Sequence, residues 1–190
     1  MALENLDIEG LSHKVTGLTG DMCTFHLETR FDLIVVPREA LQLLPSKMAA
    51  AALSNMSRHL KLNTGRLIVD LASFSSKTNE DRDPDYYYPS IKDGSKYNNW
   101  SRRTPDGKTL TRVSSQNTYD DRIDFTFDYN IEPLEDWVWS ANMVVFKYDL
   151  DWVKQHVSPN MRIRNVWGNY DREPFKEGDS RIIIELNRIN

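Results

Sequence analysis

The stretch "RFDLIVVPREALQLLPSKMAAAALSNMSRHLKLNTGRLIVDLASF", residues 30–74, decides the fold. Residues 31–36 form a short apolar run, rich in β-branched side chains, that stops at Pro37, which predicts a strand buried on both faces. Ser46 then caps a predicted helix whose apolar residues recur at helical spacing. Residues 66–71 supply a second apolar strand. Strand, helix and strand with short connections predict a βαβ unit with two parallel strands.

The residues that follow the first strand, Pro37, Arg38 and Glu39, are the first candidates for a functional site. In a parallel sheet with helical crossovers, ligands bind beyond the carboxyl ends of the strands. This position makes Glu39 the candidate catalytic base and Arg38 a candidate substrate contact. An acidic residue in the first turn of a helix has the same pattern for a purely structural reason, so both interpretations of Glu39 stay open.

The segment before this stretch has weaker patterns. Residues 3–9 have a helical composition, and residues 14–18 alternate between apolar and polar, which predicts a short strand ending before Gly20. Asp21 follows this glycine. An aspartate at such a position commonly closes a turn through its own side chain, so a ligand-binding role needs further support.

The middle of the chain contains a long predicted loop, residues 75–95, with turn formers, mixed charge and three successive tyrosines. Loops of this length in compact domains are usually lids or binding loops, although a solvated connector has the same composition. Exposed adjacent aromatic side chains are costly unless something covers them. Tyr86 and Tyr88 are therefore candidate substrate contacts.

From residue 96 the apolar period changes to two, which predicts four antiparallel strands at residues 96–104, 109–119, 122–131 and 136–148. The apolar face of the third strand is expected to carry Ile123, Phe125, Phe127, Tyr129 and Ile131. Trp100 fits either the wall of a substrate pocket or a dimer interface. Arg102, Arg103 and Arg112 could meet an anionic substrate, but they are expected instead to pair across strands with Asp124 or Asp128.

The last stretch returns to α/β. Residues 149–157 predict a short helix, and residues 162–171 and 181–189 predict two strands joined by a turn. An antiparallel pair at the end of an otherwise parallel sheet is a common arrangement, so these strands are expected to close the first sheet.

Composition narrows the function classes. The 190-residue chain is 39% hydrophobic, enough for one core, and its net charge of -4 makes a nucleic-acid partner unexpected. A single cysteine, Cys23, excludes an intrachain disulfide and a cysteine-rich metal site, and the four histidines have no metal-ligand spacing. No leader peptide or membrane-spanning run is expected, which predicts a cytoplasmic protein without a membrane partner.

The segments "LTGDM", "RFDLIVVPREALQLL", "LSNMSRHLKLNTGRLIVDLASF" and "VWGNYDREPFKEGDSRIIIELNR" resemble successive motifs of class I S-adenosylmethionine-dependent methyltransferases, particularly those that modify sugars and antibiotics. The resemblance covers roughly residues 10–190. It implies that the Asp21 carboxylate accepts from the adenine amino group and that Met22 packs on the adenine ring. It also implies that Pro37 lies beneath the methyl donor, S-adenosylmethionine, and that the substrate is a small molecule such as a sugar.

The chain departs from this family at its start. The family begins with a strand and a Gly-rich turn, then a second strand that ends in an acid for the ribose, and "ENLDIEGLSHKV" cannot supply both. The predicted fold class is therefore α/β: a truncated Rossmann-like methyltransferase sheet with a four-stranded antiparallel β insertion. The expected parts are a partial core at 1–74, the loop and meander at 75–148, and the closing helix and strands at 149–190.

Three interpretations of this departure stay open. The missing half is supplied elsewhere and the chain is a methyltransferase or part of one; or the chain no longer uses the cofactor and catalyses a cyclisation or isomerisation; or it is a non-catalytic partner of a full-length relative. Missing central strands would leave apolar edges unpaired. All three interpretations therefore predict a homo-oligomer or a complementing methyltransferase-like subunit.

Overall fold

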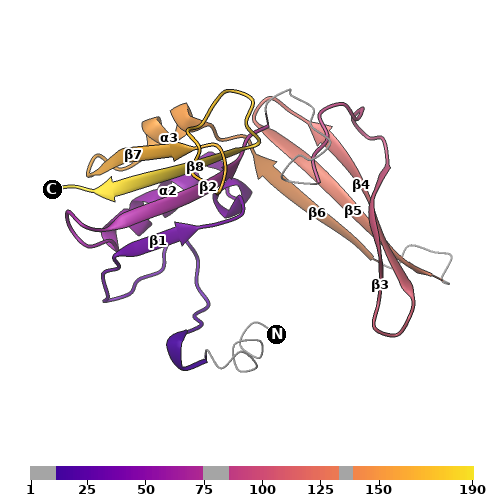
Figure 1. The fold of residues 1–190 in the computed structure, drawn as a ribbon, viewed down its shortest axis with the longest axis horizontal. Helices are drawn as coiled ribbons and strands as arrows, with labels where there is room; N and C mark the ends of the chain where they lie inside the picture. The colour runs from indigo at the N-terminus through magenta and orange to yellow at the C-terminus, as the bar shows by residue number, and fades with distance from the viewer. Residues whose placement is uncertain (1–11, 75–85, 133–138) are drawn as a thin grey trace.

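The chain folds around two four-stranded sheets (Figure 1), in a computed structural model that describes residues 12–74, 86–132 and 139–190. The strands of the first sheet are β1 (Leu33–Val36), β2 (Arg66–Ala72), β7 (Met161–Trp167) and β8 (Arg181–Arg188). They lie in the order β1-β2-β8-β7, with β1 and β2 parallel and β8 antiparallel to both of its neighbours. The parallel unit and the antiparallel closing pair are thus confirmed.

The second sheet is an antiparallel meander in the order β3-β4-β5-β6. Its strands are β3 (Tyr97–Arg103), β4 (Thr109–Thr118), β5 (Arg122–Glu132) and β6 (Trp139–Phe146). The helices are η1 (Ser12–Lys14), η2 (Ala40–Leu43), α2 (Ser46–Arg58) and α3 (Leu150–His156). The α/β class with a four-stranded antiparallel insertion, predicted from the sequence, is therefore confirmed.

Helix α2 forms because small and apolar residues recur on one side of it. Ala49, Ala52, Leu53 and Met56 are buried in the same core as the inward-facing residues of β2 and β8. The predicted cap at Ser46 was wrong: Pro45 is the N-cap residue, and no side chain caps this end of the helix.

Both α helices lie on one face of the first sheet (Figure 1), where their apolar residues share a core with β2 and β8. The prediction that β1 is buried on both faces was wrong. Leu33 and Val35 are 45% and 50% exposed, whereas Val36 is 3% exposed. Successive residues of a strand point to opposite faces, so the exposed pair marks the face that the helices leave open.

The meander has its own core on one face of β5. Ile123, Phe125 and Phe127 alternate with less buried residues, as the period of two predicted, and Tyr87 packs against them. Gln116 of β4, a buried polar residue on this face, binds the backbone of Tyr88 with both ends of its amide. Its Nε2 donates to the Tyr88 carbonyl at 3.0 Å, and its Oε1 accepts from the Tyr88 N–H at 3.4 Å. The three successive tyrosines are thus anchored to the meander.

Gln42 in η2 joins the two sheets. Its fully buried amide donates to the carbonyls of Ala72 and Phe146 at 3.1 and 3.0 Å and accepts from the Ala72 N–H at 2.7 Å. One side chain thereby satisfies backbone groups at the end of β2 and at the end of β6.

Two further predictions were wrong, and others lie outside the described residues. Residues 15–18 form no strand, because no described strand lies beside them, and Leu18 is 70% exposed. Asp124 pairs with Arg122, and Asp128 with Lys96, instead of with the arginines of β3 and β4. The predicted helical segment 3–9 and residues 75–85 of the loop lie outside the described part of the chain.

Candidate active site

The turn that leaves β1 has an unusual backbone. Arg38 and Glu39 are consecutive non-glycine residues with positive φ angles of 50° and 58°, a conformation that is rare and costs about 1–3 kcal/mol per residue in general. Asp70 of β2 holds both residues, because its Oδ2 accepts from the Arg38 N–H at 2.9 Å and its carbonyl accepts from the Glu39 N–H at 3.2 Å. The carboxyl ends of the two parallel strands are therefore tied together at this turn.

A cluster of charged side chains lies beneath the turn. We call Glu39, Asp70, Arg181 and Tyr170 the carboxylate cluster. Arg181 Nη1 lies 2.8 Å from Glu39 Oε1 and 2.6 Å from Asp70 Oδ1, and all three side chains are at most 8% exposed. The Tyr170 hydroxyl donates to Asp70 Oδ2 at 2.9 Å, and the Arg181 guanidinium lies 5.0 Å from the centre of the Tyr170 ring. The cluster thus fixes the turn to β8 and to the β7–β8 loop.

The sequence candidates at this turn fall into two groups. The Glu39 side chain is buried and ion-paired with Arg181, whereas Pro37 and Arg38 are exposed at the end of β1. The residues that organise the turn, Asp70 and Arg181, were missed by sequence reasoning, although an aspartate inside an apolar strand is itself a signal of a buried polar role.

The loop of Asp21 and Met22 lies at the same end of the first sheet. The Cys23 thiol donates to the Met48 carbonyl at 3.3 Å, and Met48 lies in the first turn of α2, the helix that follows β1 and η2. Asp21 Oδ1 accepts from the Cys23 N–H at 2.7 Å, so the carboxylate closes its own turn while the residue stays exposed. Both roles of Asp21 considered from the sequence are compatible with this geometry.

Met22 is half-buried beside an apolar hollow of about 400 Å³, lined by Leu18, Thr19, Gly20, Met22, Phe25, His26 and Leu27. The pKa of the Cys23 thiol is raised, chiefly by burial and to a smaller extent by the hydrogen bond and the charge of Asp21. A thiol with a raised pKa is a poor nucleophile, so Cys23 has a packing role here.

Asn55 of α2 and His59, the residue that caps the C-terminal end of this helix, hold the loop in place, and sequence reasoning gave neither of them this role. Asn55 Nδ2 donates to the carbonyls of Met22 and Phe25 at 3.2 and 2.9 Å. His59 Nε2 accepts from the Leu27 N–H at 3.1 Å, so its ring proton is on Nδ1 and is donated to the Asn55 carbonyl at 2.9 Å. The signal in the sequence was the position of Asn55 on the otherwise apolar face of the predicted helix, because a buried amide needs hydrogen-bond partners.

The predicted substrate contacts lie on the meander, away from the turn in sequence. Tyr86 packs edge-on against Phe125 with ring centres 5.1 Å apart, and Tyr88 packs against Tyr97 at 5.2 Å. Both tyrosines remain partly exposed. They are therefore available as a wall, but each is also part of the packing of the second sheet.

Trp100 lies near the middle of β3, where Arg102 and Arg112 approach its ring at 4.6 and 5.3 Å. Nearby, burial raises the pKa of the Tyr97 hydroxyl to about 12. Two of the arginines predicted to form cross-strand ion pairs, Arg102 and Arg112, thus make cation–π contacts with an aromatic side chain instead, and Arg103 donates to the Gly107 carbonyl.

Within the described ranges, no three histidine, cysteine or acidic side chains gather as metal ligands would. No helix of the same ranges is both long and apolar enough to cross a membrane.

Comparison of the sequence with protein-family models gives no match, and comparison with curated proteins gives no relative. Solved structures do match. An S-adenosylmethionine-dependent methyltransferase from Clostridium acetobutylicum superposes with a TM-score of 0.73 at 14% identity, over 99% of this chain and 71% of the other. The CcbJ methyltransferase from Streptomyces caelestis gives 0.77 at 9% identity, over 98% and 73%.

The chain has the fold of S-adenosylmethionine-dependent methyltransferases. A third match is CalS10 from Micromonospora echinaspora, an amino pentose methyltransferase involved in calicheamicin biosynthesis, solved with S-adenosylmethionine bound. Its TM-score is 0.64 at 18% identity, over 96% of this chain and 70% of the other. Identities at this level show a common methyltransferase fold and leave the activity and the substrate to be tested.

The described residues fit the adenine end of this cofactor. An exposed carboxylate at Asp21 and an apolar hollow beside Met22 match the donor and the flat ring of an adenine. Among the described glycines, Gly17 and Gly20 come before this loop, and neither lies in a strand–turn–helix unit that could cradle the rest of the cofactor.

Proposed function

We propose that the chain is a methyltransferase, or the acceptor half of one, that transfers a methyl group from S-adenosylmethionine to a small molecule such as an amino sugar or a natural-product intermediate. The observation that carries this proposal is that the Asp21–Met22 loop, through the Cys23–Met48 hydrogen bond, lies beside the start of α2, near the end of a methyltransferase-type sheet that carries the strained Arg38–Glu39 turn.

In this proposal Asp21 accepts from the adenine amino group and Met22 packs on the ring. When bound, the cofactor supplies an electrophilic methyl group on a sulfonium. The chain has to hold the acceptor atom in line with that methyl group, because proximity and orientation carry much of the rate of a displacement. The turn held by Asp70 supplies a rigid floor, with Pro37 and Arg38 exposed at its surface.

Glu39 is the proposed catalytic carboxylate. An acceptor amine or hydroxyl loses a proton on methylation, and in this proposal the Glu39 carboxylate receives that proton. The ion pair with Arg181 holds this carboxylate in one position under the turn. Tyr86, Tyr88 and Trp100 are the proposed contacts to the acceptor, which supports an acceptor with an apolar ring face, as sugars have.

Hydrogen exchange with and without S-adenosylhomocysteine tests this proposal without a known acceptor. We expect the added compound to slow exchange at residues 19–25 and 36–40 and to leave β4 unchanged. Asp21→Asn keeps an oxygen for the Cys23 N–H but removes the charge, and should abolish most of the protection; Asp32→Asn, on an exposed pair with Lys61, is the control. Protection confined to other segments, or none in the wild-type chain, would refute the proposed site.

A further inference from the structure

The face of the first sheet opposite α2 and α3 is apolar and only partly covered, since Leu33 and Val35 are 45% and 50% exposed whereas Ile183 is 6% exposed. Leu33 and Val35 of β1 point to it, and the register places Val35 beside Ile68 of β2. Ile183 of β8 and Trp167 of β7 continue this surface, since they pair across the same sheet. We call these five residues the open face.

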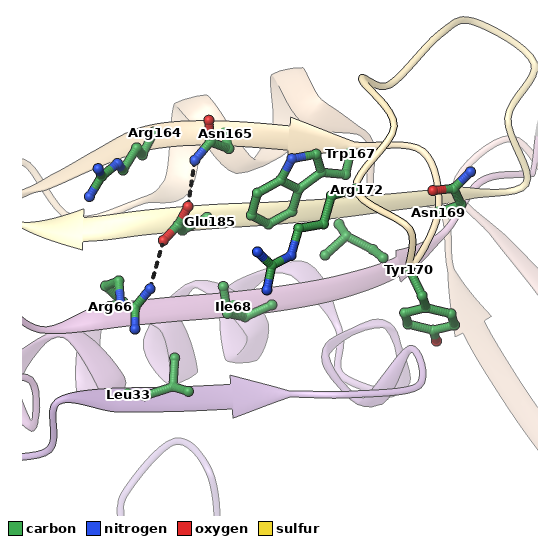
Figure 2. A pocket seen from close by; sticks show the side chains of 11 residues that line it. Leu33, Arg66, Ile68, Arg164, Asn165, Trp167, Asn169, Tyr170, Arg172 and Glu185 are labelled. Atoms are coloured by element: carbon green, nitrogen blue, oxygen red, sulfur yellow. Dashed lines mark hydrogen bonds and ion pairs between the residues drawn. The ribbon is translucent and has the colours of Figure 1, made fainter.

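Part of the open face is hollowed. A cavity of about 440 Å³ lies over β2, β8 and β7 and is roofed on one side by the β7–β8 loop (Figure 2). Three arginines surround its apolar floor: Arg66 from β2, Arg164 from β7 and Arg172 from the loop. Figure 2 shows Arg172 beside Trp167 and above Ile68, and its guanidinium lies 5.8 Å from the Trp167 ring.

The charge of this face differs in sign from that of the chain, whose net charge is -4. Its one acidic residue, Glu185, is 6% exposed at its side chain and is already bound by Asn165 at 2.5 Å and by Arg66 at 3.5 Å. Within the described residues, Arg164 and Arg172 make no ion pair and are both exposed. The open face is thus apolar at its centre and basic at its margin.

This combination disfavours a second copy of the chain as the occupant. Two open faces packed together would bring the same arginines into opposition, and like charges across an interface cost binding energy. Pairing two copies through the edge of β1 would extend the sheet and leave Leu33 and Val35 uncovered. The charge pattern therefore points to a partner with an acidic margin.

The dimensions of the face fit one helix. Four strands about 4.8 Å apart span roughly 14 Å, and an α-helix with its side chains is about 10–12 Å wide. We propose that the open face is a docking surface for an amphipathic helix of another polypeptide. Its apolar stripe covers Leu33, Val35 and Ile68, and its carboxylates meet Arg164 and Arg172. This inference does not depend on the proposed catalytic function.

A designed peptide tests the proposal. The probe is an 18-residue, end-capped, fluorescein-labelled helix with a leucine stripe flanked by glutamates, and the matched probe has lysine in place of every glutamate. We expect fluorescence anisotropy to show binding of the acidic peptide only. Arg164→Glu with Arg172→Glu should weaken it at least tenfold, and Lys47→Glu with Lys92→Glu, which reverses two exposed charges elsewhere, should change it less than twofold.

Hydrogen exchange of the wild-type chain gives a second test that needs no variant. Bound acidic peptide should slow exchange in β1 and β7 and leave β4 unchanged. The proposal is overturned if the acidic peptide does not bind, if the double reversal leaves its affinity unchanged, or if light scattering shows a dimer whose formation Val35→Lys abolishes. Binding of anionic lipid vesicles in place of the peptide would also overturn it.

Discussion

Arg181→Met gives the sharpest test of the carboxylate cluster. Methionine replaces the aliphatic stem of arginine with an apolar chain of similar shape, but it removes the cation that lies 2.8 Å from Glu39 and 2.6 Å from Asp70. Two carboxylates with side chains at most 8% exposed are then left facing one another. Because Asp70 also holds the Arg38–Glu39 turn, the substitution should disturb the end of β1 as well.

The expected loss is large on the scale of single substitutions. Removing one partner of a buried ion pair costs about 3–5 kcal/mol of unfolding free energy, because the remaining charge stays buried without compensation. For a chain of this size that corresponds to a decrease in melting temperature of about 6–20 °C. Lys61→Met is the control: Lys61 pairs with Asp32 at 2.8 Å, but the two side chains are 48% and 76% exposed, so its loss should cost about 0–1 kcal/mol.

Urea unfolding followed by tryptophan fluorescence and by circular dichroism measures both variants. We expect Arg181→Met to lower the midpoint strongly with an unchanged slope, and Lys61→Met to stay close to the wild type. Equal effects of the two substitutions, or a loss below about 1 kcal/mol for Arg181→Met, would refute the reasoning that the cluster supports this end of the sheet.

Gln42→Ala should lower the unfolding free energy by about 2–4 kcal/mol in the same urea assay, because three buried hydrogen bonds between the sheets are lost; an effect below 1 kcal/mol would contradict this. Asn55→Ala should speed hydrogen exchange at residues 22–27, since two carbonyls of that loop lose their donor, and Ser54→Ala on the same helix serves as the control. The pKa of Tyr97 is raised from 10 to about 12, so its contribution to stability is present below pH 10 and is lost as the pH rises toward 12. Tyr97→Phe should therefore make the fall in stability between pH 10 and 12 shallower, and an unchanged fall in alkaline urea titrations would count against the burial of this hydroxyl.

The strands and helices of this chain were largely predictable from local pattern. The period of two in β5 and the apolar runs of β2 and β8 each contain enough residues to fix both the element and its inward face. The strand predicted at residues 14–18 failed because a strand needs a neighbour, and the local pattern carries no information about whether one is present. For the same reason the exposure of Leu33 and Val35 could not be foreseen.

The candidate site was predictable only in outline. The sequence pattern predicted that Pro37, Arg38 and Glu39 follow a parallel strand, and the structure places them at the carboxyl end of β1. The residues that hold this turn are Asp70 of β2 and Arg181 of β8. They lie 31 and 142 positions after Glu39 in the sequence. Contacts between residues so far apart in the sequence depend on how the strands pair in the folded sheet, so no short sequence motif predicts them.

Calorimetric titration of the chain with S-adenosylhomocysteine tests the central claim most directly. The account predicts saturable one-to-one binding, weakened about tenfold to a hundredfold by Asp21→Asn, as the loss of one hydrogen bond to a charged group implies, and unchanged by Asp32→Asn. A well-folded chain that releases no heat with this compound, or that binds it equally well without the Asp21 charge, would contradict a cofactor site at this end of the sheet.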